Sequence, residues 1–171
     1  MKNGRLILVV GPSGAGKDTV LAYARMHLAA YPQCVFPQRV ITRPPGPGED
    51  YESISEAEFQ QRNFALSWQA HGLYYGIPQG IEDDLAAGKT VIINVSRAVI
   101  PNAREKYNCQ VIEITAPIDI LAKRLAGRGR ETEADIAARL ARNDASVEAD
   151  ATIINDGMPE AAGAMFLAKL S

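Results

Sequence analysis

The fold of this 171-residue chain is decided by RLILVV at 5–10 and the stretch that follows it, GPSGAGKDT at 11–19. The first stretch is short, apolar and rich in β-branched residues, and a glycine follows it, which is typical of a strand buried on both faces of a sheet. A helical pattern then runs from Lys17 to about Ala30, and Pro32 closes it. The sequence therefore predicts a buried strand, a glycine-rich turn and a helix in immediate succession.

The glycine-rich turn has the spacing of a phosphate-binding loop (P-loop). Gly11, Gly16 and Lys17 fit the pattern of Gly, any four residues, then Gly-Lys. The glycines let consecutive backbone N–H groups point inward at phosphate oxygens, and the lysine ammonium reaches the β- and γ-phosphates. A bare glycine-rich turn is the alternative, but the strand before the loop and the helix after it favour phosphate binding. The predicted nucleotide-binding residues of this loop are Gly11, Pro12, Ser13, Gly14, Ala15, Gly16, Lys17, Asp18 and Thr19, with Lys17 also catalytic.

The position after Lys17 departs from the pattern, because it holds Asp18 rather than Ser or Thr, and Thr19 follows. A hydroxyl at this position normally ligates Mg²⁺. Either Asp18 supplies an oxygen to the ion, directly or through water, or Thr19 supplies the hydroxyl and Asp18 only favours the helix start. The strand pattern at 90–95 lacks a terminal acidic residue, which tilts the choice slightly toward Asp18. The expected cofactors are ATP and Mg²⁺.

The rest of the chain alternates strand and helix patterns, with a hairpin-like stretch at 64–77. Strands separated by helices imply a parallel sheet with helices on both faces. We therefore predict a single α/β domain over 1–171, with inserted excursions at about 36–80 and 127–133. The further strands are expected at 34–42, 90–95, 110–115 and 151–154, and Pro37 indicates an edge or a bulge in the first of them. The further helices are expected after Ser55, from Pro78 to Gly88, at about 97–106, 117–126 and 132–146, and from Pro159.

The charge and hydrophobicity of the chain argue against some classes of binding partner. The net charge is −2 and the sequence pI is about 5.7, which argues against a general binder of nucleic acid or membrane surfaces. The apolar run at 6–10 is too short to span a bilayer or to serve as a signal core. We therefore expect a cytoplasmic protein whose partners are small-molecule substrates.

Basic residues gather at a junction between two predicted helices, where Arg128 and Arg130 flank Gly129 in GRGRE. Arginine side chains stabilise the charge that spreads over a phosphoryl group in transfer, and a loop closing over the nucleotide excludes water. This pattern favours a lid at about 127–133, and a solvated basic helix face is the alternative. The basic residues of this region are Lys123, Arg124, Arg128, Arg130, Arg139 and Arg142.

A second set of donors lies in the excursion at 36–80. Arg39, Arg43, Tyr51 and Tyr75 suit a phosphate already carried by an acceptor substrate. Simple packing is the alternative role for the tyrosine pair Tyr74 and Tyr75.

At these residues the chain resembles the guanylate-kinase branch of the nucleoside monophosphate kinases. The shared stretches, in the family's order, are GPSGAGK, TRPPGPGE, W-x(6)-YG, LAAGKTVII, RLAGRG and IIND. The resemblance implies a P-loop NTPase of the nucleoside-monophosphate-kinase type, three-layered, with a central five-stranded parallel sheet, an acceptor-binding insertion and a lid. It also implies that Arg43, Tyr51 and Tyr75 hold the acceptor phosphate, that Arg124, Arg128 and Arg139 act on the transferring group, and that Asn155 lies near the adenine.

The chain departs from guanylate kinases where those enzymes read guanine. The corresponding positions hold Arg39, Ala70 (or a one-residue gap), Ile77 and Ser96, and the second arginine of the TRPPRPGE motif is Gly46. A site built to hydrogen-bond a base edge loses most of its affinity without those partners. The phosphate-binding groups are largely retained, so the acceptor is expected to lack a base.

Other motifs are similar to those of the ribose 1,5-bisphosphate phosphokinases: GKDT, VITRPP, FALSW-x-AHGL-x-YGIP, NVSRA and RGRE. This resemblance implies ATP-dependent phosphorylation of ribose 1,5-bisphosphate to 5-phosphoribosyl 1-diphosphate in phosphonate breakdown. The extra cations Arg39, Arg97 and Arg130 suit the second phosphate, and His71 suits a ribose hydroxyl. A guanylate kinase is the first alternative. A non-catalytic guanylate-kinase-like binding module is the second, and the retained P-loop and lid arginines oppose it.

Overall fold

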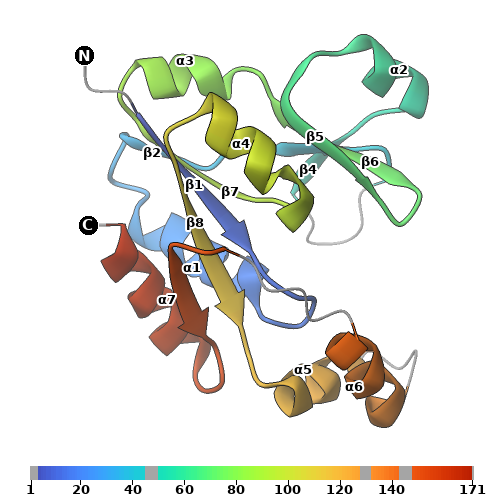
Figure 1. Cartoon of the computed structure of the whole chain (residues 1–171). Helices are drawn as coiled ribbons and strands as arrows, with labels where there is room; N and C mark the ends of the chain where they lie inside the picture. The colour runs from blue at the N-terminus through green and yellow to red at the C-terminus, as the bar shows by residue number, and fades with distance from the viewer. Residues whose placement is uncertain (1–3, 45–49, 128–131, 143–147, 171) are drawn as a thin grey trace. The chain divides into compact units, whose positions relative to one another are not determined.

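The computed structural model describes residues 4–44, 50–127, 132–142 and 148–170 (Figure 1). The chain divides into two compact units. Unit 1 comprises Met1–Leu8 and Tyr31–Gln110, and unit 2 comprises Val9–Ala30 and Val111–Ser171. No helix of the described ranges is long and apolar enough to cross a membrane.

A five-stranded sheet has the strand order β2-β7-β1-β8-β9, and its β2–β7 and β8–β9 pairs are parallel. The side chains from Leu6 to Val10 are completely buried, as expected for a strand covered on both faces. The predicted α/β fold with a five-stranded parallel sheet is therefore confirmed. The strands are β1 (Arg5–Val10), β2 (Cys34–Val35), β7 (Thr90–Asn94), β8 (Cys109–Thr115) and β9 (Ala151–Ile154).

Unit 2 carries the helix that follows the glycine-rich loop. This helix, α1 (Lys17–His27), packs against α7 (Pro159–Lys169), which also contacts β9 (Figure 1). The approach is close, since a Cβ placed on Gly163 would lie 2.4 Å from the Tyr23 ring. The absence of a side chain at 163 thus sets the distance between the two helices.

Two further helices of unit 2 pack on each other, α5 (Ile118–Ala126) and α6 (Glu133–Arg142). Their contact is built on Ala122, Leu125 and Ile136, which are all buried. The predicted capping signature is confirmed, because the Thr132 hydroxyl accepts a hydrogen bond from the Asp135 N–H at 3.2 Å. The helix therefore begins where the sequence predicts it.

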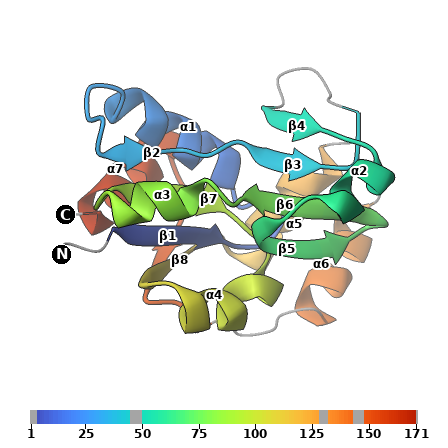
Figure 2. The same cartoon turned by 90° about the horizontal axis from the view of Figure 1, so that it is seen from above.

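Unit 1 contains a second, four-stranded sheet of order β4-β3-β6-β5 (Figure 2). The sequence predicts one strand at 34–42, and this prediction is wrong. The structure has two short strands there, β2 in the first sheet and β3 (Arg39–Ile41) in the second, and Pro37 lies between them. Proline has no N–H for a ladder, so the break falls at this point. The strands not yet introduced are β4 (Tyr51–Ser53), β5 (Phe64–Ala70) and β6 (Leu73–Pro78), of which β4 was not predicted.

The helices of unit 1 are short. In α2 (Glu56–Gln61) the predicted cap is confirmed, because the Ser55 hydroxyl accepts from the Glu58 N–H at 3.1 Å. Phe59 of this helix stacks on Phe64 and contacts the Tyr74 ring, so Tyr74 has the packing role that was the alternative for the tyrosine pair. The others are α3 (Ile81–Ala86), the 3₁₀ helix η1 (Arg97–Val99) and α4 (Ile100–Lys106).

Candidate functional site

The loop between β1 and α1 has the backbone of a phosphate cradle. Gly16 precedes the helix with φ 86° and ψ 27°, a left-handed conformation that glycine adopts without strain. Gly11 has φ 150°, and a Cβ at this position would lie 1.9 Å from the Ile114 carbonyl oxygen of β8. The two motif glycines are therefore required by backbone conformation and by the closeness of the neighbouring strand.

The Lys17 ammonium is folded back over the loop. It donates hydrogen bonds to the carbonyl oxygens of Gly11 and, at 3.3 Å, Pro12. The Pro12 oxygen also accepts from the Ala15 N–H at 3.2 Å, which closes a tight turn inside the loop. A half-buried ammonium placed beside backbone N–H groups provides the positive charge that nucleotide phosphates need.

Arg124 and Asn155 brace the cradle from α5 and from the end of β9. The Arg124 guanidinium donates to the Gly14 carbonyl at 3.0 Å and to the Asn155 carbonyl at 2.7 Å. The Asn155 side-chain amide donates to the Ala15 carbonyl at 2.8 Å. The sequence predicts both residues as ligand contacts, and in the structure these hydrogen bonds go to backbone carbonyls of the protein.

Asp18 and Thr19 both lie exposed in the first turn of α1. A carboxylate and a hydroxyl oxygen are hard donors, and Mg²⁺ in kinases takes only one or two protein ligands beside phosphate oxygens and water. The donor chemistry of the two residues therefore fits Mg²⁺. Among the described residues no group of three or more His, Cys, Asp or Glu side chains could hold a metal ion.

The predicted lid falls mostly outside the described residues, and so do Arg128 and Arg130. Arg139 belongs to α6, but its side chain also lies outside the described part of the chain. The lid and the roles of these three arginines remain predictions.

Strand register brings the predicted acceptor residues of unit 1 to one face of the second sheet. Arg39 of β3 pairs with Tyr51 of β4, and Ile41 pairs with Tyr75 of β6. Directly paired residues project to the same face of a sheet, and so do residues two apart on one strand. Because Trp68 of β5 pairs with Tyr75, its side chain joins this face as well.

Two of these residues are tied together through hydrogen bonds. The Arg43 Nε–H donates to the Tyr51 hydroxyl at 3.1 Å, and that hydroxyl donates to the Pro44 carbonyl at 2.7 Å. The guanidinium carbon also lies 5.4 Å from the centre of the Tyr51 ring. Tyr51 is buried, so these contacts hold the Arg43 guanidinium in place on unit 1.

Trp68 belongs to the W-x(6)-YG stretch, and the sequence does not predict it as a site residue. Its ring stacks on that of Tyr75, with centroids 5.3 Å apart and planes at 4°. Both side chains are half-buried. Trp68 and Tyr75 are separated by an odd number of positions, as cross-strand partners around a two-residue turn are. The sequence indicates this pairing only when the hairpin register is known.

His71 occupies the tip of the β5–β6 hairpin. It has φ 54° and is followed by Gly72 with φ 73°, so the two form a two-residue turn of the type that hairpins favour. The imidazole is exposed. The geometry of the turn is therefore a sufficient structural reason for a residue at position 71, and the contact of His71 with a ribose hydroxyl stays a prediction.

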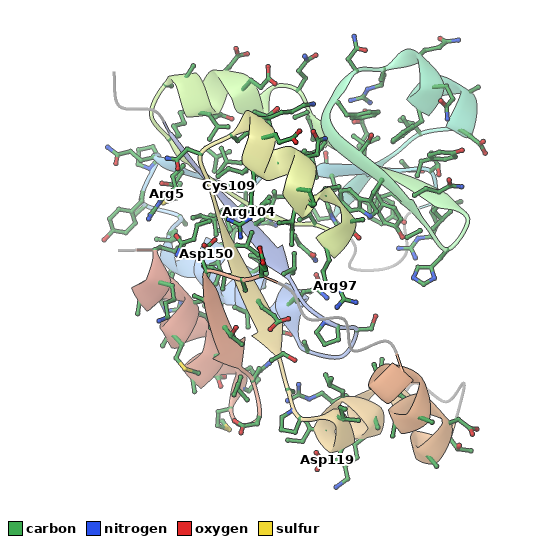
Figure 3. All side chains as sticks on the ribbon, in the orientation of Figure 1. Arg5, Arg97, Arg104, Cys109, Asp119 and Asp150 are labelled. Carbon is green, nitrogen blue, oxygen red and sulfur yellow. The ribbon has the colours of Figure 1, made fainter. Side chains whose placement is uncertain are left out.

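Arg97 and Ser96 lie at the start of η1, which contacts β5. The Ser96 hydroxyl accepts from the Ala98 N–H at 3.2 Å and caps this short helix. Arg97 is the first residue of η1 and is exposed (Figure 3). The capping serine thus has a structural role where guanylate kinases carry an acidic residue, and the arginine adds positive charge to unit 1.

The fold and the cradle define a P-loop phosphotransferase, and comparison with known proteins gives the family. The guanylate kinase family model matches residues 3–165. The chain belongs to the guanylate kinase family.

Within this family, two relatives that share one name are similar to nearly the whole chain. It is 61% identical over 166 residues to "Ribose 1,5-bisphosphate phosphokinase PhnN" of Acidiphilium cryptum, covering 97% of this chain and 92% of that protein. It is 51% identical over 172 residues to the protein of the same name in Methylobacterium radiotolerans, covering 98% and 97%. The similarity therefore extends over nearly the whole of both sequences.

Solved structures agree on the fold. The guanylate kinase of Anaplasma phagocytophilum superimposes with a TM-score of 0.71 at 20% sequence identity, covering 99% of this chain and 86% of that one. At this identity the likeness shows the fold alone.

Proposed function

We propose that the chain transfers the γ-phosphoryl group of ATP to ribose 1,5-bisphosphate, giving 5-phosphoribosyl 1-diphosphate and ADP. The observation that carries the proposal is the 61% identity, over 97% of the chain, to a ribose 1,5-bisphosphate phosphokinase. The retained cradle at 11–19 supports a nucleotide donor, and the face that carries Arg39 and Tyr51 supports a phosphorylated acceptor. A cytoplasmic location and a place in phosphonate breakdown belong to the same proposal.

The donor half of the reaction is assigned to unit 2. Lys17 and the loop N–H groups neutralise the β- and γ-phosphates, and Arg124, Arg128 and Arg139 act on the transferring group. Mg²⁺, held through Asp18 or Thr19, would add positive charge between the phosphates.

The acceptor half is assigned to unit 1. Arg43, Tyr51 and Tyr75 bind the 5-phosphate, and additional cations serve the second phosphate. Buried Ile77 offers no hydrogen bond to a base edge, and the hydroxyl of Ser96 already caps η1. The remaining assignments are Arg39, Arg97 and Arg130 for the second phosphate and His71 for a ribose hydroxyl.

The chemistry needs no general base. An oxygen of the 1-phosphate attacks the γ-phosphorus in line, a new P–O bond forms, and the bond from the γ-phosphorus to the bridging oxygen of ADP breaks. A phosphate monoester has a second pKa of roughly 6, so the attacking oxygen is already mostly anionic near neutral pH. Catalysis is then positioning of the two substrates and neutralisation of their charge.

A guanylate kinase is the second candidate, favoured by the family model over residues 3–165. A coupled assay of ADP release, offering ribose 1,5-bisphosphate and GMP in parallel, separates the two. We expect kcat/KM for the sugar bisphosphate to exceed that for GMP, because the guanine edge would be left without hydrogen-bond partners in this site, and unpaired polar groups are costly to bury. A higher kcat/KM for GMP would reject the proposal, and ATP binding without transfer to either acceptor would point to a binding module.

A further inference from the structure

One polar side chain stands apart in the described part of the chain. Asn155, directly after β9, is 5% exposed and is the only buried polar or charged residue there. A buried amide is costly where its hydrogen bonds are not made. The side-chain oxygen of Asn155 has no hydrogen-bond partner among the described residues, so the groups that its other polar atoms contact indicate why the residue is retained.

The contacts of Asn155 all converge on the phosphate loop and its supports. Its backbone N–H donates to the Thr115 carbonyl at 2.7 Å, which extends the β8–β9 ladder by one residue. Its backbone carbonyl accepts from Arg124 at 2.7 Å, and its side-chain amide donates to the Ala15 carbonyl at 2.8 Å. The backbone of Asn155 is thus fixed to β8 and to Arg124 of α5, while its side chain holds the loop.

The bond to Ala15 sets the direction of the next N–H. In a planar trans peptide the carbonyl of one residue and the N–H of the following residue point in opposite directions. Holding the Ala15 carbonyl against Asn155 therefore turns the Gly16 N–H to the opposite side of the loop. Among the backbone hydrogen bonds of the described residues, Gly16 accepts from Val20 and donates to none.

The amide of Asn155 also lies directly against Gly16. A Cβ built at residue 16 would lie 2.5 Å from the Asn155 Nδ2. The glycine of the motif is therefore needed both for its φ of 86° and for the space that the asparagine fills.

We infer that Asn155 is a positioning residue of the phosphate cradle. Its carboxamide locks the Ala15–Gly16 peptide so that the Gly16 N–H is aimed at a bound phosphate, and Arg124 locks the preceding carbonyl, that of Gly14, in the same way. This role is separate from a contact with adenine and holds whichever acceptor the enzyme uses.

Inorganic tripolyphosphate tests the inference, because it occupies a phosphate cradle and has no base. We expect Asn155→Ala to weaken binding of tripolyphosphate and of ATP by a similar factor, on the order of tenfold, measured by titration calorimetry. The matched control is Asp156→Ala, an exposed neighbour, which should leave both affinities unchanged. Weaker binding of ATP with unchanged binding of tripolyphosphate would mean that Asn155 serves the base, and would overturn the inference.

Two readouts separate positioning from a loss of folding. In Asn155→Ala we expect kcat to fall and KM for ATP to rise, while KM for the acceptor stays constant. In the unmodified protein we expect the Gly16 amide proton resonance to move downfield when tripolyphosphate is added. A Gly16 resonance that does not respond to saturating tripolyphosphate would overturn the inference even if the variant fails to fold.

Discussion

At the scale of single residues, Lys17 is the predicted catalytic residue of the loop, and its surroundings differ from those of a core residue. Its ammonium donates to the carbonyl oxygens of Gly11 and Pro12, and it is half-buried rather than enclosed in the core. Its neighbours Asp18 and Thr19 are exposed. Substitutions at these three positions should therefore change chemistry with little effect on folding.

We expect Lys17→Ala to keep the thermal unfolding midpoint within a few degrees and to lower kcat by at least about 10²–10³, the usual effect of removing one stabilising donor from a transition state. Steady-state assays and circular dichroism measure the two quantities. Lys17→Arg is the control, since it keeps the charge but changes its geometry, and it should recover only part of the activity. Full activity in Lys17→Ala would reject the assignment.

Asp18 and Thr19 can be separated by their effect on the metal. We expect Asp18→Asn to raise the Mg²⁺ concentration for half-maximal activity by roughly tenfold, because an amide oxygen is a weaker ligand for a hard cation than a carboxylate. Thr19→Val should raise this Mg²⁺ concentration by a smaller factor. The reverse order would assign the metal to Thr19.

At the scale of elements, the β5–β6 hairpin positions Tyr75, one of the residues predicted to bind the acceptor. Its two-residue turn fixes the register, and the register puts Trp68 and Tyr75 opposite each other. His71 must adopt the positive φ of this turn, in addition to making any contact with a substrate.

We expect His71→Asn to keep the free energy of unfolding within about 0.5 kcal/mol, because Asn is well suited to positive φ in such a turn. If the imidazole contacts a ribose hydroxyl, KM for the acceptor rises several-fold, the usual effect of losing one hydrogen bond. Trp68 is the only tryptophan of the chain, so its fluorescence reports acceptor binding directly. An unchanged fluorescence titration in His71→Asn would remove His71 from the acceptor site.

A hydrogen bond between the end of α4 and α3 makes stability depend on pH. The Tyr107 hydroxyl donates to Glu82 at 2.7 Å, and burial, this bond and the carboxylate charge together raise the pKa of Tyr107 above its ordinary value of 10.0. Above that value the unfolded chain loses the phenol proton while the folded chain keeps it, so the free energy of unfolding falls as pH rises. We expect denaturant titrations above pH 10 to show a steeper loss in the wild type than in Tyr107→Phe, and equal slopes would contradict the coupling.

At the scale of the whole molecule, the residues predicted to bind the donor and those predicted to bind the acceptor belong to different units. The cradle, Arg124 and Asn155 lie in unit 2, whereas the sheet of Arg39, Tyr51 and Tyr75 lies in unit 1. Each ligand should therefore stabilise mainly the unit that it contacts.

We expect tripolyphosphate to slow hydrogen exchange in Val9–Ala30 and Val111–Ser171, and ribose 5-phosphate to slow it in Tyr31–Gln110, because a ligand stabilises the segments that it contacts against local opening. Mass spectrometry of peptides from the two units measures this. Lys17→Ala is the control for tripolyphosphate and Arg43→Ala for the sugar phosphate. Protection spread evenly over both units by either ligand alone would contradict the division of the site.

Much of the first sheet and of the loop could be predicted from sequence, because their signals are local. Strand β1, the motif glycines and the caps at Ser55 and Thr132 each depend on neighbours within a few residues. The break at Pro37 and the three-residue strand β4 were not predicted, because such short strands are stabilised by partners far along the chain.

The sequence by itself determined the P-loop and its lysine, the family and the loss of the guanine-reading groups, since these rest on residue identity and spacing. Only the tertiary structure decided that Arg124 and Asn155 brace the cradle carbonyls, and that Arg39, Tyr51, Trp68 and Tyr75 share one sheet face. The reason is that these relations join residues up to 140 positions apart, as in the bond from Asn155 to Ala15, and depend on strand register and peptide orientation.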